Sequence, residues 1–248
     1  MMLAIDGIVT EATRPGVAGG ENVMGNRFRD RTDAGKQLAH ALRDYQGRGD
    51  LVVLALPRGG VPVAFEVARE LRAKLDVLVV RKLGAPQDEE LAMGAIATGG
   101  ALHLERSVLR ELQISDTQLS DVIARERAEL ARRELAYRGD SPPVAVQGKT
   151  VIVIDDGIAT GASMHAAIDA LRGRNPARIV VAVPVAQSDA PMAFEGIADA
   201  FVSVLQPDLL MGIGGFYVNF EQTTDEEVRA CLAAARGWEP EQSSDSIG

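Results

Sequence analysis

The stretch VIVIDDGIATGAS, residues 151–163, decides the fold. It opens with four consecutive apolar residues, a run typical of a strand that is buried on both faces of a parallel sheet. Two carboxylates, Asp155 and Asp156, follow at once, and a turn of small residues then leads into a helical pattern. Strand, turn and helix in this order predict an open α/β sheet, in which ligands bind beyond the carboxyl ends of the strands.

The same order of elements recurs on both sides of this stretch. An apolar run is followed by the turn Pro57-Arg58-Gly59-Gly60, by a helical pattern to about Leu71 and by a second strand. We therefore predict a mostly parallel central sheet flanked by helices. The apolar runs that we assign to its strands are 51–56, 76–80, 149–154, 178–183 and 200–205.

A different pattern separates the second of these strands from the central one. The polar stretch 83–91 predicts a mobile loop, and residues 94–97 and 101–104 predict a hairpin. A capping box, Ser-x-x-Gln from Ser115, then begins a highly charged helix that we expect to reach Arg138.

The composition is that of a folded domain. Of the 248 residues, 46% are hydrophobic and 25% are charged, so the chain can bury a substantial core without disulfides or metals. We expect this domain to span 27–237, with a long helical insertion at about 107–140. A loose N-terminal extension, 1–26, would precede it, and a disordered tail, 238–248, would follow it.

Charge and cysteine content restrict the partners and the compartment. The net charge of −9 opposes binding to a nucleic-acid backbone, and the apolar runs are far too short to cross a bilayer. We therefore expect neither a nucleic-acid nor a membrane partner, while a homodimer stays open. The single cysteine, Cys231, can form no internal disulfide, and the N-terminus lacks the pattern of a signal peptide. Both observations favour the cytoplasm.

Residues 155–163 carry the groups that a sugar phosphate needs. Asp155 and Asp156 can accept hydrogen bonds from vicinal ribose hydroxyls, and the small residues of the turn let backbone N–H groups approach a phosphate. Thr160 and Ser163 add hydroxyl donors, and the helix dipole favours the phosphate dianion. The turn has neither the Gly-Lys-Ser/Thr of a Walker loop nor the Gly-x-Gly-x-x-Gly of a dinucleotide site.

This block resembles the ribose-phosphate signature of the type I phosphoribosyltransferases, and the order of elements is similar from about Arg27 to Arg236. The residues of the block are similar to those of a poorly characterised bacterial branch of the family. The resemblance implies an enzyme, a glycosyltransferase that uses phosphoribosyl pyrophosphate and Mg²⁺. Such an enzyme moves the phosphoribosyl group to a nitrogen acceptor, usually a nucleobase, and releases pyrophosphate. Mg²⁺ would be held mainly by oxygens of the donor, and no metal-ligand cluster is evident in the sequence.

The resemblance also assigns roles to individual residues. Asp155 and Asp156 would hold the ribose hydroxyls, and Arg58-Gly59-Gly60 would be the pyrophosphate loop; an ordinary turn with an exposed arginine is the alternative. Arg81 and Lys82 would neutralise the leaving pyrophosphate, unless they are simple surface charges. Residues 83–93 would form a flexible loop that closes over the site. The loop around the 5′-phosphate would consist of Gly157, Ile158, Ala159, Thr160, Gly161, Ala162 and Ser163.

The sequence does not specify the acceptor. Family members that act on 6-oxopurines place an Asp where this chain has Ala159, so we expect hypoxanthine and guanine to be poor acceptors. In this family the base is recognised by a variable hood, for which residues 211–220 and the pair Tyr137-Arg138 are candidates; aromatic filling of the core is the alternative. A second function also stays open, a non-catalytic sensor or regulatory protein that binds phosphoribosyl pyrophosphate.

Overall fold

The computed structural model describes residues 27–236 and Trp238. The expected N-terminal extension, 1–26, and the expected tail beyond Trp238 lie outside the described residues. Trp238 itself packs on Phe65, with the ring centroids 5.0 Å apart. Within the described part of the chain, no helix combines the length and the apolar character that spanning a bilayer requires.

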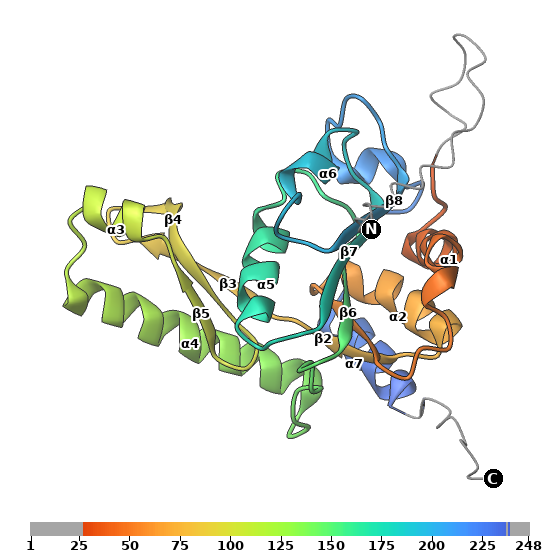
Figure 1. The fold of residues 1–248 in the computed structure, drawn as a ribbon, viewed down its shortest axis with the longest axis horizontal. Helices are drawn as coiled ribbons and strands as arrows, with labels where there is room; N and C mark the ends of the chain where they lie inside the picture. Colours follow the sequence, from red (N-terminus) through yellow and green to blue (C-terminus); the bar gives the residue numbers. More distant parts are fainter. Residues whose placement is uncertain (1–26, 237, 239–248) are drawn as a thin grey trace, which may run out of the picture.

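A five-stranded parallel sheet forms the centre of the protein, in the order β2-β1-β6-β7-β8 (Figure 1). This arrangement confirms the predicted α/β class. The order of strands reverses between β1 and β6, so the carboxyl ends of these two strands border the crevice where open α/β sheets bind ligands. The strands are β1 (Leu51–Ala55), β2 (Lys74–Val77), β6 (Thr150–Ile154), β7 (Arg178–Val185) and β8 (Ala200–Leu205).

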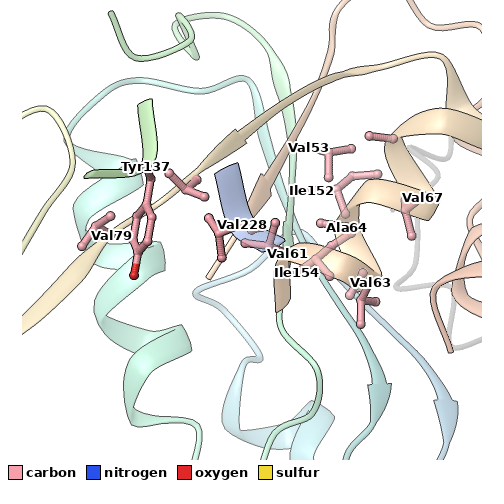
Figure 2. Packing of buried hydrophobic residues seen from close by; sticks show 14 of the residues in the cluster. Val53, Val61, Val63, Ala64, Val67, Val79, Tyr137, Ile152, Ile154 and Val228 are labelled. Carbon is pink, nitrogen blue, oxygen red and sulfur yellow. The ribbon is translucent and has the colours of Figure 1, made fainter. Parts of the chain in front are cut away.

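Helices cover both faces of this sheet, because its inner strands β1, β6 and β7 are buried on both faces. Alternate strand residues join two core clusters: Val53 and Ile152 belong to one, and Val151 and Val153 to the other. The first cluster contains α1 (Arg31–Ala41), α2 (Gly60–Leu71) and α7 (Asp225–Ala235), and the second contains α5 (Ala162–Arg172). Figure 2 shows Val53, Ile152 and Ile154 of the sheet packed near Val61, Ala64 and Val67 of α2.

Residues 80–104 form a second, antiparallel sheet of the strands β3 (Val80–Ala85), β4 (Asp88–Ala97) and β5 (Ala101–Leu104). The prediction of a mobile loop at 83–91 is therefore wrong, since β3 and β4 pair across that stretch. Leu83 and Met93 are buried in the cluster that includes α4 (Asp116–Arg138). The polar residues between them gave no sign that these strands would pack against a helix. The predicted hairpin of β4 and β5 is confirmed. In Figure 1, the small sheet and α4 lie to one side of the central sheet.

The long helix α4 has the bounds that its capping signal predicts. The Ser115 hydroxyl accepts the N–H of Gln118, and the Gln118 side chain accepts the N–H of Ser115. At the other end, buried Arg138 donates to Asp76 and to the carbonyl oxygen of Val77, both at 2.6 Å. Tyr137 is also buried in the core. Of the two alternatives for Tyr137 and Arg138, the structure favours filling of the core, because Arg138 bonds β2 and the Tyr137 hydroxyl bonds Asp225, the first residue of the C-terminal helix.

The remaining short elements complete the connections between these layers. They are the 3₁₀ turns η1 (Arg43–Tyr45) and η2 (Ile213–Phe216) and the short helices α3 (Arg106–Glu111) and α6 (Ala190–Ala193).

Candidate active site

The acidic pair lies at the carboxyl end of β6, where the order of strands reverses. Asp155 and Asp156 are half-buried, and the backbone N–H of Asp156 donates to Oδ1 of Asp155 at 2.8 Å. Burial and the neighbouring charge of Asp156 raise the pKa of Asp155 well above its usual range. Burial also raises the pKa of Asp156, although Arg31 opposes this shift. Carboxylates with perturbed pKa values in a ligand crevice mark a candidate functional site.

Arg31, which the sequence reasoning did not select, is the counter-charge of Asp156. It donates from Nε to Oδ2 of Asp156 at 2.8 Å, and its Nη2 lies 2.8 Å from the same oxygen. Its Nη1 donates to the carbonyl oxygen of Glu221 at 2.6 Å, and the guanidinium carbon lies 4.0 Å from the ring centroid of Phe220. Arg31 is the first residue of α1, where the helix dipole disfavours a cation. The sequence offered no signal for this contact, because the two residues are 125 positions apart.

The predicted pyrophosphate turn, residues 58–60, lies against the acidic pair. A Cβ atom at Gly59 would be 2.0 Å from Oδ2 of Asp156, and one at Gly60 would be 2.7 Å from the carbonyl oxygen of Ile154. Real Cβ atoms do not approach other atoms this closely, so a larger residue would force the Asp156 side chain to move at position 59 and the β6 backbone to move at position 60. The Arg58 side chain is 3.8 Å from Oδ1 of Asp225, at the start of α7.

The predicted phosphate loop, residues 157–163, connects β6 to α5. Gly161 precedes the helix with φ of 77° and ψ of −3°, the left-handed conformation that glycine adopts most readily. The N–H of Ile158 donates to the carbonyl oxygen of Val185 at 2.9 Å and fixes the loop to β7. The loop and the first turn of α5 expose Ala159, Thr160, Ala162 and Ser163. This is the end of a helix at which backbone N–H groups have no partners within the helix.

The two predicted basic residues, Arg81 and Lys82, lie on β3 in the small sheet. Arg81 donates from Nε and Nη2 to Oε2 of Glu126 at 2.9 and 2.7 Å. Glu126 is a buried residue of α4, so Arg81 joins the small sheet to the long helix. Contact between Arg81 and a pyrophosphate group would require this ion pair to open, whereas Lys82 is exposed.

The predicted hood residues, 211–220, lie beside the acidic pair, and we call the segment 211–221 the hood. Buried Tyr217 donates its hydroxyl to the backbone carbonyl oxygen of Asp156 at 2.7 Å, and burial raises the pKa of this phenol. Its ring packs 5.4 Å from that of Phe28. Tyr217 is thus part of the core that supports the acidic pair, while Phe220 and Met211 are 36% and 89% exposed. Met211 and Phe220, together with Val218, which is 70% exposed, are thus hood side chains that an acceptor could reach.

Comparisons with known proteins agree with this geometry. Residues 28–198 match the phosphoribosyl transferase domain family. The chain is 44% identical over 208 residues to a phosphoribosyl transferase so named in two strains of Mycobacterium tuberculosis, CDC 1551 and H37Rv. That alignment covers 84% of this chain and 47% of the relative, so the chain spans about half the length of the curated relatives it matches. The crystal structure of TT1426 from Thermus thermophilus superposes with a TM-score of 0.75 at 43% identity, over 86% of this chain and 99% of that one. The chain belongs to the phosphoribosyl transferase domain family.

Proposed function

We propose that the protein transfers a phosphoribosyl group from phosphoribosyl pyrophosphate to a nitrogen acceptor, and that this acceptor is a nucleobase. The observation that carries the proposal is the assembly of three features at one end of β6. The acidic pair offers acceptors for ribose hydroxyls, and the glycine turn 58–60 approaches it closely. The loop 157–163 offers backbone donors for a 5′-phosphate at the start of α5.

In the proposed reaction, the bond between ribose C1 and the pyrophosphate oxygen breaks, and pyrophosphate leaves with the electron pair. The acceptor nitrogen forms a new bond to C1 and loses its proton to water. Positive charge develops on the ribose in the transition state, so catalysis depends on positioning and on electrostatic stabilisation rather than on an enzyme nucleophile. Asp155 and Asp156 would lie near that charge, and Arg58 belongs to the turn that would carry the leaving group.

Mg²⁺ would neutralise the charge of the pyrophosphate group. It prefers oxygen ligands and keeps several of its waters, and the carboxylates of the acidic pair are of the right chemical type. Among the described residues, no group of three or more His, Cys, Asp or Glu side chains could hold a metal ion. We therefore propose that the donor's own oxygens and water supply most of the coordination.

The proposal extends to the choice of base. Ala159 is exposed in the phosphate loop and offers no carboxylate to a purine. A hydrogen-bonding group that is left unpaired on a buried base costs about 1–3 kcal/mol, which corresponds to a discrimination of roughly tenfold to a hundredfold. Hypoxanthine and guanine are accordingly proposed to be poor acceptors.

The decisive experiment mixes the protein with labelled phosphoribosyl pyrophosphate, Mg²⁺ and each of five bases: adenine, uracil, xanthine, guanine and hypoxanthine. Formation of a nucleotide together with pyrophosphate would support the proposal. Tight binding of the donor without turnover on any base would instead support the non-catalytic sensor. Absence of donor binding would contradict both functions. The variant that carries both Asp155→Asn and Asp156→Asn is the matched control, and it should be folded but inactive.

A further inference from the structure

Arg31 joins the acidic pair to the hood. Its guanidinium group contacts the Asp156 carboxylate, the carbonyl oxygen of Glu221 and the ring of Phe220. The side chains of Arg31 and Asp156 are only 12% and 15% exposed, so water screens this ion pair weakly. The two partners are 125 positions apart in the sequence. Residues from α1, from the end of β6 and from the hood therefore meet at one cation.

The hydrogen bonds of the acidic pair distinguish the two oxygens of each carboxylate. Two nitrogens of Arg31, Nε and Nη2, contact Oδ2 of Asp156. Oδ1 of Asp155 accepts the backbone N–H of Asp156. Within residues 27–236, the bonds that orient the pair therefore end on one oxygen of each carboxylate, Oδ2 of Asp156 and Oδ1 of Asp155. The other oxygen of each carboxylate is the one that we assign to an outside donor, and two adjacent ribose hydroxyls are donors of the right number.

We propose that Arg31 is a positioning residue of the ribose site: it holds Oδ2 of Asp156, presents Oδ1 to a ribose hydroxyl, and couples this anchor to hood residues 217–221. The inference rests on the proposed function. Two neighbouring carboxylates repel each other, and a cation beside one of them keeps that group ionised and oriented. The planar guanidinium can bond a carboxylate and a carbonyl group while it stacks on a ring, which a lysine ammonium cannot do.

Arg27 provides a matched control. It also joins the start of the described chain to the hood, because its Nη2 donates to the carbonyl oxygen of Tyr217. Arg27 is exposed, and its recorded bond reaches neither Asp155 nor Asp156. Arg27→Ala therefore removes a tie to the hood and leaves the counter-charge of Asp156 in place.

The test is isothermal titration calorimetry with three probes: phosphoribosyl pyrophosphate with Mg²⁺, ribose 5-phosphate, and pyrophosphate with Mg²⁺. For Arg31→Ala, we expect the affinity for the two ribose-bearing probes to fall at least about tenfold, and that for pyrophosphate to stay within about twofold. Arg31→Lys should recover part of the loss, because it keeps the charge but not the second set of bonds. Arg27→Ala should bind all three probes within about twofold of the wild type.

Three results would overturn the inference. The first is unchanged binding of ribose-bearing probes by folded Arg31→Ala, the second is an equal loss for pyrophosphate, and the third is an equal loss in Arg27→Ala. The last two would mean that a loosened hood explains the effect. If circular dichroism shows Arg31→Ala to be unfolded, Arg31→Lys takes its place. Its loss of affinity for the two ribose-bearing probes is then compared with its loss for pyrophosphate. A wild-type protein that binds no phosphoribosyl pyrophosphate would contradict the proposed function itself, and the inference would fall with it.

Discussion

Replacing Gly59 by alanine should displace the Asp156 carboxylate without straining the backbone. Gly59 has φ of −59° and ψ of −35°, which any residue can adopt. The added Cβ would lie 2.0 Å from Oδ2 and 2.6 Å from Cγ of Asp156, so the carboxylate must move by more than an ångström to reach ordinary contact. That movement breaks the bonds to Arg31. Disrupting a largely buried, charge-assisted pair costs about 2–4 kcal/mol of stability, because the moved carboxylate can re-form only some of its bonds.

Urea denaturation measures this loss, and it should also appear as a decrease of roughly 5–15 °C in melting temperature. The affinity for phosphoribosyl pyrophosphate should fall at least about tenfold in the same variant. Gly173→Ala is the control, since its Cβ would lie 3.6 Å from the nearest atom, and its stability should change by no more than about 0.5 kcal/mol. If Gly59→Ala kept both the stability and the affinity of the wild type, the close approach of this turn to Asp156 would be refuted.

Four further predictions follow from the same geometry. Gly161→Val should weaken binding of phosphoribosyl pyrophosphate at least about tenfold by calorimetry, because valine is strained at φ of 77°; unchanged affinity in a folded variant would remove the phosphate-loop assignment. Asp155→Asn should raise the midpoint of thermal unfolding at pH 7, because ionising a carboxyl whose folded-state pKa is raised costs stability. This penalty is absent below the ordinary carboxyl pKa of about 4, so the gain should disappear there, and a gain independent of pH would contradict the argument. Arg138→Leu should cost about 3–5 kcal/mol in urea denaturation because it leaves Asp76 buried without its cation, and a loss below about 1 kcal/mol would contradict that role. In steady-state assays, guanine and hypoxanthine should show a kcat/KM at least about tenfold below that of the preferred base, and a preference for either would refute the reading of Ala159.

Local signals in the sequence predicted the features that depend on neighbouring residues. The capping box at Ser115 predicted the start of α4, and it is present with the expected hydrogen bonds. The apolar runs predicted the inner strands of the central sheet because β1, β6 and β7 are buried on both faces. The strand predicted at 76–80 is the exception, since β2 ends at Val77 and β3 begins at Val80.

Features that depend on distant residues escaped prediction. The β3–β4 hairpin has a polar sequence, and its stability comes from packing against a helix that follows it in the chain. Arg138 is buried because Asp76, 62 positions away, compensates its charge. The contact between Arg31 and Asp156 spans 125 positions, and neither residue alone specifies the other. The acidic pair and its loop could be predicted because their residues are adjacent in the sequence. The residues that surround them come from distant parts of the chain and are brought together only by the fold.

One end of the long helix is connected to the glycine turn. Its 23 residues span about 34 Å, and Arg138 anchors one end while the Ser115 end lies away from the central sheet (Figure 1). At the Arg138 end, the Tyr137 hydroxyl donates to Asp225 at 3.2 Å, and Asp225 lies 3.8 Å from Arg58. A hydrogen bond and an ion pair thus connect the end of the long helix, through the start of α7, to the arginine of the glycine turn beside the acidic pair.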